Sequence, residues 1–134
     1  GKEVIARGFG ATKDKHALNQ PNYNPNLPRF IQETSLRVDD PFACSARDKR
    51  PDNSMLCTKE IKLGSQTCIA DSGRPIIFEK QNKKYLIGLV SWPPSGRCGF
   101  NEPNYLTRIS VFREWIMNTM QFYENLPISE YITE

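Results

Sequence analysis

Histidine is nearly absent from this chain: of its 134 residues, only His16 is a histidine. The four cysteines include no pair separated by two residues, so the spacing typical of zinc sites is also missing. His16 lies in a polar stretch rich in asparagine and proline, residues 11–28, where a histidine is ordinarily just solvated. We therefore expect no metal site and no other cofactor.

Long apolar runs are missing too, since none approaches the ~20 residues that cross a membrane. No signal peptide opens the chain, so we expect either that it was removed or that the chain is part of something longer. No Asn-x-Ser/Thr sequon occurs. The net charge is only +3, and the basic clusters at 47–50 and 80–84 sit in polar loops. Such clusters indicate solvated turns, not a nucleic-acid surface.

The cysteines form an even set of four, which favours two disulfides and an oxidising, extracellular compartment. The residues alone allow three pairings of four cysteines. The set consists of Cys44, Cys57, Cys68 and Cys98.

Short apolar segments separated by turns predict many strands in one compact domain. Residues 86–90 are apolar on both faces, as expected for a buried central strand. Ser110 is a good N-cap for an amphipathic helix that reaches to about residue 121. The tail, 122–134, is either docked or frayed. This pattern predicts an all-β barrel or sandwich with a C-terminal helix, with strands at 4–10, 30–38, 55–57, 75–79, 85–92 and 105–109.

The stretch from Cys68 to Pro75 contains Asp-Ser-Gly just before a predicted strand. A serine beside glycine in a tight turn before a strand is one way to present a nucleophilic hydroxyl. The same composition is also ordinary for a turn, because Asp, Ser, Gly and Pro each favour turns. Alone, the stretch leaves both interpretations of Ser72 open.

Several further motifs occur around this stretch, and together they resemble the C-terminal half of a trypsin/chymotrypsin-like serine protease domain. They follow the order and spacing of that family from residue 8 to about 117. The matching segments are Gly8-Phe9-Gly10, Met55-Leu56-Cys57, Cys68 to Pro75, Ile87 to Trp92, Cys98-Gly99, Pro103, Tyr105 to Ser110 and Trp115-Ile116.

The resemblance implies the second six-stranded antiparallel Greek-key barrel of the two-barrel fold, with its C-terminal helix. Residues 1–121 would form this unit, and 122–134 a C-terminal extension. The resemblance also implies the disulfides Cys44–Cys57 and Cys68–Cys98.

The family's mechanism assigns roles by motif. Ser72 would be the nucleophile, and the backbone N–H groups of Ala70 and Ser72 would form the oxyanion hole. Asp71 would receive the N-terminal ammonium that is created when a zymogen is activated. Ser91 would support the aspartate of the triad. The resemblance implies a substrate pocket formed by Gln66, at its base, with Ser91, Trp92, Pro93 and Asn104.

The chain departs from the family in two respects. The histidine and aspartate of the triad are absent, because the family supplies both from the first barrel, and a serine without a base is a weak nucleophile. A partner chain or segment carrying that barrel is therefore implied, and it would also cover the apolar face that a lone half-domain exposes. The second departure is the loss of glycines from the oxyanion hole, the pocket walls and the Gly-Gly-Pro motif, at Ala70, Pro93, Asn104 and Arg74.

Three functions follow as alternatives. With its missing half, the chain is part of a secreted endopeptidase that prefers a small or uncharged side chain, because Gln66 makes Arg/Lys preference unexpected. Alternatively, it is an inactive homologue that serves as a binding, cofactor or assembly subunit. An unrelated secreted disulfide domain would require every motif to be coincidental. Gly1 is not the Ile/Val-rich activation terminus, so we expect a proteolytic product, a fragment or a separately encoded subunit.

Overall fold

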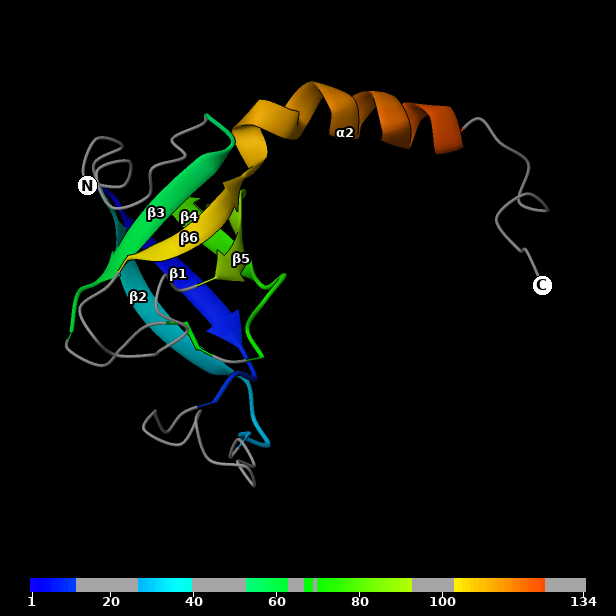
Figure 1. Ribbon diagram of the computed structural model, residues 1–134. Helices are drawn as coiled ribbons and strands as arrows, with labels where there is room; N and C mark the ends of the chain where they lie inside the picture. Colours follow the sequence, from blue (N-terminus) through cyan, green and yellow to red (C-terminus); the bar gives the residue numbers. More distant parts are fainter. Residues whose placement is uncertain (12–26, 40–52, 63–66, 69, 93–102, 125–134) are drawn as a thin grey trace.

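The computed structural model describes residues 1–11, 27–39, 53–62, 67–68, 70–92 and 103–124. These residues form six antiparallel strands and one helix (Figure 1). The sheet order is β1–β2–β3–β6–β5–β4, and β4 also pairs with β1, so the sheet closes into a barrel. The elements are β1 (Glu3–Gly8), β2 (Gln32–Val38), β3 (Met55–Glu60), β4 (Pro75–Lys80), β5 (Lys83–Trp92), β6 (Asn104–Arg108) and α2 (Ile109–Glu124).

The barrel interior is filled by alternate residues of the strands, because successive side chains of a strand point to opposite faces. In β1, for example, Val4 and Ala6 are buried while Glu3 is exposed. The six-stranded antiparallel barrel with a C-terminal helix is thus confirmed, and a sandwich is not formed. The buried core consists of Val4, Ala6, Leu36, Ile76, Val90 and Leu106.

The structure differs from the predicted strand and helix boundaries, and from the predicted burial of one strand. Strand β3 continues to Glu60, three residues beyond its predicted end. Leu86 is 45% exposed, so the prediction that 86–90 is buried on both faces is wrong: a barrel strand has one outer face. Helix α2 begins at Ile109, directly after β6, which places Ser110 inside its first turn instead of at the N-cap. The helix ends at Glu124, beyond its predicted end near residue 121.

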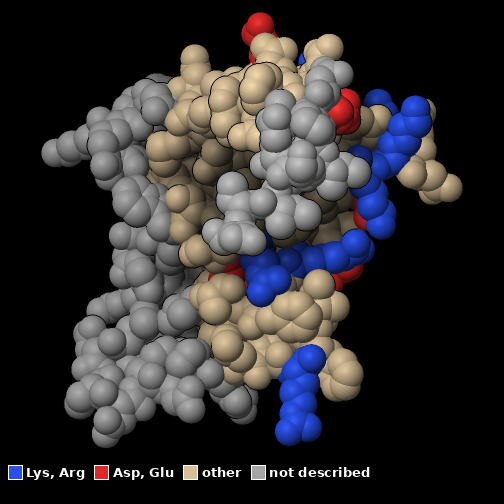
Figure 2. Space-filling model, turned by 90° about the vertical axis from the view of Figure 1, so that its right-hand side faces the viewer, with Lys and Arg blue, Asp and Glu red and all other residues tan. Residues whose placement is uncertain are grey.

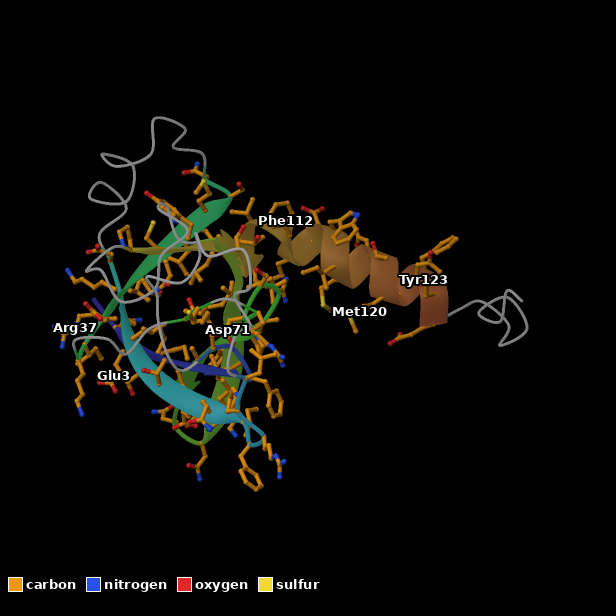
Figure 3. The ribbon with its side chains drawn as sticks, turned by 60° about the horizontal axis from the view of Figure 1, so that its bottom comes forward. Glu3, Arg37, Asp71, Phe112, Met120 and Tyr123 are labelled. Atoms are coloured by element: carbon orange, nitrogen blue, oxygen red, sulfur yellow. The ribbon has the colours of Figure 1, made fainter. Side chains whose placement is uncertain are left out.

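Helix α2 projects from the barrel and has no buried residue (Figure 1). Figure 3 shows Met120 and Tyr123 on the part of the helix that lies beyond the strands. An isolated helix of this length is marginal in water. Its large exposed apolar side chains are Val111, Phe112, Trp115, Met117, Met120, Phe122 and Tyr123.

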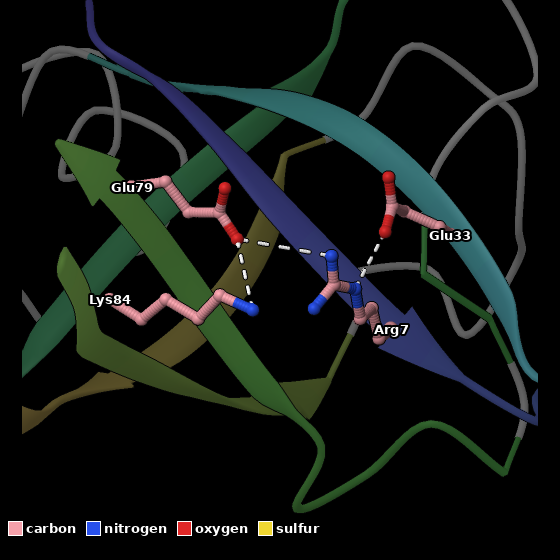
Figure 4. Close-up of polar contacts among 4 residues, drawn as sticks. All are labelled: Arg7, Glu33, Glu79 and Lys84. Atoms are coloured by element: carbon pink, nitrogen blue, oxygen red, sulfur yellow. Dashed lines mark hydrogen bonds and ion pairs between the residues drawn. The ribbon is translucent and has the colours of Figure 1, made fainter. Parts of the chain in front are cut away.

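Charged side chains on the barrel exterior form cross-strand pairs. Arg7 of β1 donates from Nε to Glu33 of β2 at 2.6 Å and lies 3.9 Å from Glu79 of β4 (Figure 4). Lys84 of β5 lies 3.7 Å from the same Glu79 carboxylate. The hydrogen bond that Arg7 donates to Glu33 raises the pKa of Arg7, because it stabilises the charged guanidinium. Exposed pairs of this kind add little stability, but their placement suits the register of β1 against β2.

On the face of the molecule in Figure 2, most of the Lys and Arg side chains lie close together in one band, with a few Asp and Glu atoms beside them. The interpretation of the hairpin lysines at 80–84 as solvated turn residues stays a prediction. The basic cluster at 47–50 lies outside the described residues. No helix among the described residues is long and apolar enough to cross a membrane.

Candidate active site

The turn at Ser72 is formed by two local backbone hydrogen bonds, each between residues three positions apart. The N–H of Asp71 donates to the carbonyl of Cys68 at 3.0 Å, and the N–H of Arg74 donates to the carbonyl of Asp71 at 2.9 Å. Gly73 has a φ of +78°, which glycine adopts at no steric cost. Ser72 lies at the apex of this double turn and is exposed to solvent.

The turn is attached to the end of β5. The N–H of Gly73 donates to the carbonyl of Val90 at 2.7 Å, and the N–H of Val90 donates to the carbonyl of Arg74 at 2.9 Å. The register of β5 against β6 shifts between Val90 and Trp92, which leaves Ser91 at an irregularity. Irregularities of this kind redirect backbone groups near functional sites. Here the Ser72 hydroxyl lies 3.4 Å from the Ser91 carbonyl, a long hydrogen bond.

The carboxylate of Asp71 connects the turn to the end of β1. Its Oδ1 accepts from the N–H of Gly10 at 2.9 Å, and its Oδ2 accepts from the N–H of Cys68 at 2.9 Å. Hydrogen bonds to a charged acceptor are among the stronger ones in proteins. Asp71, labelled in Figure 3, is half-buried. The side chain of Asp71, the residue before Ser72, is therefore held on two sides. Its role toward an N-terminal ammonium stays a prediction.

The glycines of Gly8-Phe9-Gly10 make this approach of Asp71 possible. A Cβ added at either Gly8 or Gly10 would overlap the Asp71 carboxylate. Sequence reasoning used this motif only as a family marker and missed its contact with Asp71. Two glycines one residue apart at a strand end were the available signal, since such glycines often mark close approach of another group.

Ala70 adopts a φ of +69°, the left-handed region that alanine seldom occupies. Because a side chain restricts φ in this region, the alanine is strained. Among the described residues, no backbone acceptor pairs with the N–H of Ala70 or Ser72. The two N–H groups belong to the residues on either side of Asp71 in the chain. Their role in an oxyanion hole stays a prediction.

Relief of this strain is measurable. We expect Ala70→Gly to raise the free energy of unfolding by about 1 kcal/mol, because the left-handed conformation costs a non-glycine residue about 1–2 kcal/mol and glycine gains some unfolded-state entropy. Urea unfolding of the variant measures this change. Ala11→Gly is the matched control: Ala11 is buried and its φ is not positive, so the same substitution should destabilise there. Equal signs for the two variants would contradict the strain at Ala70.

Arg74, which stands where the family has a glycine, packs beside the same strand end. Its guanidinium carbon lies 5.2 Å from the centre of the Phe9 ring. Such cation–π contacts are favourable at partly exposed sites. The larger side chain is therefore accommodated outside the turn, on the Gly8-Phe9-Gly10 segment.

The five predicted pocket residues are only partly described. Gln66 and Pro93 lie outside the described residues, and only the backbone of Trp92 is described, as the end of β5. Ser91 is exposed. Asn104 is 1% exposed and its Oδ1 accepts from the Thr67 hydroxyl at 2.7 Å. The assignment of these residues to one pocket stays a prediction.

The predicted disulfides are also only partly described. Neither Cys57 nor Cys68 has a free thiol. Their predicted partners, Cys44 and Cys98, lie outside the described residues, so the pairing itself stays a prediction. His16 lies outside them as well. In the described ranges, no group of three or more His, Cys, Asp or Glu side chains is placed to hold a metal ion.

Comparisons with known proteins agree with this architecture. The family profile described as trypsin matches residues 1–116. Renal glandular kallikrein of Mastomys natalensis is 28% identical over 120 residues, which cover 90% of this chain and 42% of that protein. The structure of neuropsin, a serine protease expressed in the limbic system of mouse brain, superposes with a TM-score of 0.71 at 25% identity. That superposition covers 90% of this chain and 48% of neuropsin, so the chain spans less than half of each relative.

Proposed function

Because this chain belongs to the trypsin family of serine proteases and spans part of a chymotrypsin-like domain, we propose that it contributes the nucleophile of a secreted endopeptidase. The observation that carries the proposal is the Ser72 turn. Its hydroxyl is exposed, and the turn is fixed by Asp71 on one side and by β5 on the other. A nucleophile needs this combination of access and fixed position.

The chemistry requires a base from outside the described residues, which contain no histidine. A histidine of the first barrel, oriented by an aspartate, would take the proton from the Ser72 hydroxyl. The oxygen would attack the peptide carbonyl, and the N–H groups of Ala70 and Ser72 would stabilise the oxyanion. The amine would leave with the proton, and water would release the acyl group from Ser72.

This step is tested by an ester substrate on the intact two-barrel protein. We expect p-nitrophenyl acetate to give a burst of about one p-nitrophenol per active site, because acylation outpaces deacylation for such esters. Mass spectrometry should find the acetyl group on the peptide that contains Ser72. Hydrolysis without acetylated Ser72 would contradict the proposal. The absence of both would favour the inactive homologue, a binding, cofactor or assembly subunit.

The partner that we propose is the first barrel, and helix α2 supports it. The helix exposes an apolar arc that includes Trp115, which is 68% exposed, and Phe112. An apolar surface of this size is typical of an interface. The first barrel would cover this surface of the helix without adding contacts inside the second barrel.

Hydrogen exchange tests this interface. In this chain alone, we expect the backbone amides of α2 to exchange nearly as fast as in a frayed helix, because no residue of the helix is buried. The amides of β6 should be protected in the same sample and serve as the internal control. In the two-barrel protein, we expect α2 to become protected. Equal exchange of α2 in both proteins would contradict the interface.

Secretion is part of the same proposal, and it is supported by the absence of free thiols at Cys57 and Cys68. Disulfides persist in oxidising compartments and are rare in the cytosol. We propose the pairs Cys44–Cys57 and Cys68–Cys98. Peptide mapping under non-reducing conditions would identify both pairs, and any other partner for Cys57 would contradict them.

A further inference from the structure

The turn that carries Ser72 holds the segment after β1 from two sides. Asp71 and Arg74 stand at the two ends of this turn, and the N–H of Arg74 donates to the carbonyl of Asp71 at 2.9 Å. The Asp71 carboxylate accepts from the N–H of Gly10 at 2.9 Å. The guanidinium carbon of Arg74 lies 5.2 Å from the centre of the Phe9 ring. Two adjacent residues of one segment are therefore held by side chains from the two ends of one turn.

The stem of Arg74 lies against the same segment. A Cβ built on Gly8 would lie 3.5 Å from the Cγ atom of Arg74, so the stem passes close to the backbone there. In the part of the chain that the structure describes, no carboxylate pairs with this guanidinium, and the ring of Phe9 is the group that faces it. Arg74 is half-buried, and partial loss of water strengthens a cation–π contact. We call this contact the Arg74–Phe9 clamp.

The Asp71 carboxylate also closes a strained turn. Its Oδ2 accepts from the N–H of Cys68, and the N–H of Asp71 donates to the carbonyl of Cys68. Ala70 occupies the third of the four positions of this turn and has a φ of +69°. A positive φ at that position ordinarily calls for glycine. The turn is therefore closed at a cost in backbone strain, and the Asp71 side chain is what holds it closed.

We propose that Arg74 is a positioning residue that keeps the strained turn at Ala70 closed. The clamp fixes Phe9, so the N–H of the adjacent Gly10 stays within reach of the Asp71 carboxylate. The carboxylate then remains on the turn and keeps the backbone before the serine in place. The arginine thus offsets strain that the alanine introduces, and these two departures from the family's glycines are coupled. The inference rests on the proposed function, because this backbone positions the proposed nucleophile.

Native-state hydrogen exchange of the intact two-barrel protein tests the clamp without a catalytic step. Arg74→Gln keeps the Cγ atom beside Gly8 and removes the cation. We expect the N–H groups of Gly10 and Cys68 to exchange about fivefold faster in this variant, the size expected when a half-buried cation–π contact is lost. Phe9→Leu should give the same result. Phe9→Trp should slow exchange, because tryptophan is the best aromatic partner of a cation.

A second background separates positioning from a general effect on stability. Arg74→Gln should slow the p-nitrophenol burst at saturating ester by about fivefold, and Arg74→Lys, which keeps a cation, should recover most of the rate. In the Ala70→Gly background, Arg74→Gln should change both the burst and the Cys68 exchange by less than about twofold, because glycine adopts a positive φ without strain. An arginine with a merely structural role would have equal effects in both backgrounds.

Arg37→Gln is the matched control. Arg37 is exposed on β2 and is opposite Glu3 in the register, at the other end of β1 from Gly8. The substitution removes the same charge from the same sheet, so the exchange of Gly10 and the burst should both stay unchanged. Thermal unfolding of each variant shows that it is folded under the conditions of the measurement.

Each outcome decides the matter. Unchanged exchange of Gly10 in Arg74→Gln, or an equal effect of this substitution with and without Ala70→Gly, would overturn the proposal. If Ser72 forms no acyl bond, but Cys68 exchange responds to Arg74→Gln only when Ala70 is present, the positioning stands and the proposed endopeptidase fails. A reactive Ser72 whose burst does not respond to Arg74→Gln, with exchange also unchanged, would do the reverse.

Discussion

In the two-barrel protein, Ser72→Ala is expected to lower kcat/KM by roughly 10⁴- to 10⁶-fold, the loss typical of removing a serine nucleophile. The hydroxyl is the group that forms the acyl bond, and no other exposed side chain of the turn can replace it. Because Ser72 is exposed and its hydroxyl makes only a 3.4 Å contact, the free energy of unfolding should change by no more than about 0.5 kcal/mol. Hydrolysis of a chromogenic peptide and urea unfolding give the two numbers.

The matched control for this variant is Ser35→Ala. Ser35 is an exposed residue of β2, where it pairs with Ile5 on the opposite side of the sheet order from β5. The Ser35→Ala substitution should leave both kcat/KM and the free energy of unfolding nearly unchanged. If Ser72→Ala retained more than about a tenth of the activity, Ser72 would not be the nucleophile.

The second large effect is expected where β1 meets the serine turn. Asp71→Ala removes two hydrogen bonds to a charged acceptor, from Gly10 and Cys68, and should lower the free energy of unfolding by about 3 kcal/mol. Gly10→Ala should cost a similar amount, because its Cβ would occupy the space of the Asp71 carboxylate and force it away from both N–H groups.

A double-mutant cycle separates this mechanism from two independent losses. In the Asp71→Ala background the added Cβ at Gly10 meets no carboxylate, so the two effects should fall short of additivity by about 1–2 kcal/mol. Asp39→Ala is the control partner: Asp39 pairs with Lys59 at 3.0 Å, away from the turn, and should add independently to Gly10→Ala. Strict additivity with Asp71→Ala would contradict the proposed contact.

Turn signals between the apolar segments predicted separate strands in a barrel or a sandwich, and the resemblance to the protease family then implied the barrel. The residues at the Lys80–Lys84 turn show this well: β4 ends at Lys80 and β5 begins at Lys83, with Gln81 and Asn82 both at positive φ between them. Strand ends were less predictable. The polar residues Thr58 to Glu60 gave no apolar pattern, yet they pair with β2 and, at Thr58, with β6.

The candidate site was predictable by residue type and only partly by contact. Ser72, Asp71 and Ala70 were identified from the motif, but the binding of Asp71 to Gly10 joins residues 61 positions apart. No local pattern encodes such a contact. The same holds for Thr67, which sequence analysis did not select. Its hydroxyl donates to a partner in β6, Asn104, that only the closed barrel brings to it.

The chain is similar to the trypsin family but covers less than half of kallikrein and of neuropsin. The central claim is therefore that two halves of the domain supply different catalytic groups. This chain would hold the nucleophile and the oxyanion N–H groups, while the base would come from the first barrel. The exposed apolar residues of α2 fit that division, since they remain uncovered on this chain.

The most direct test is labelling with a fluorophosphonate probe, followed by mass spectrometry of the peptide that contains Ser72. We predict that the folded, activated two-barrel protein carries one probe per molecule on Ser72. This chain alone, with the same probe and the same Ser72 turn, should remain unlabelled, because no base is present. An unlabelled Ser72 in the folded two-barrel protein, or equal labelling of the isolated chain, would contradict the account.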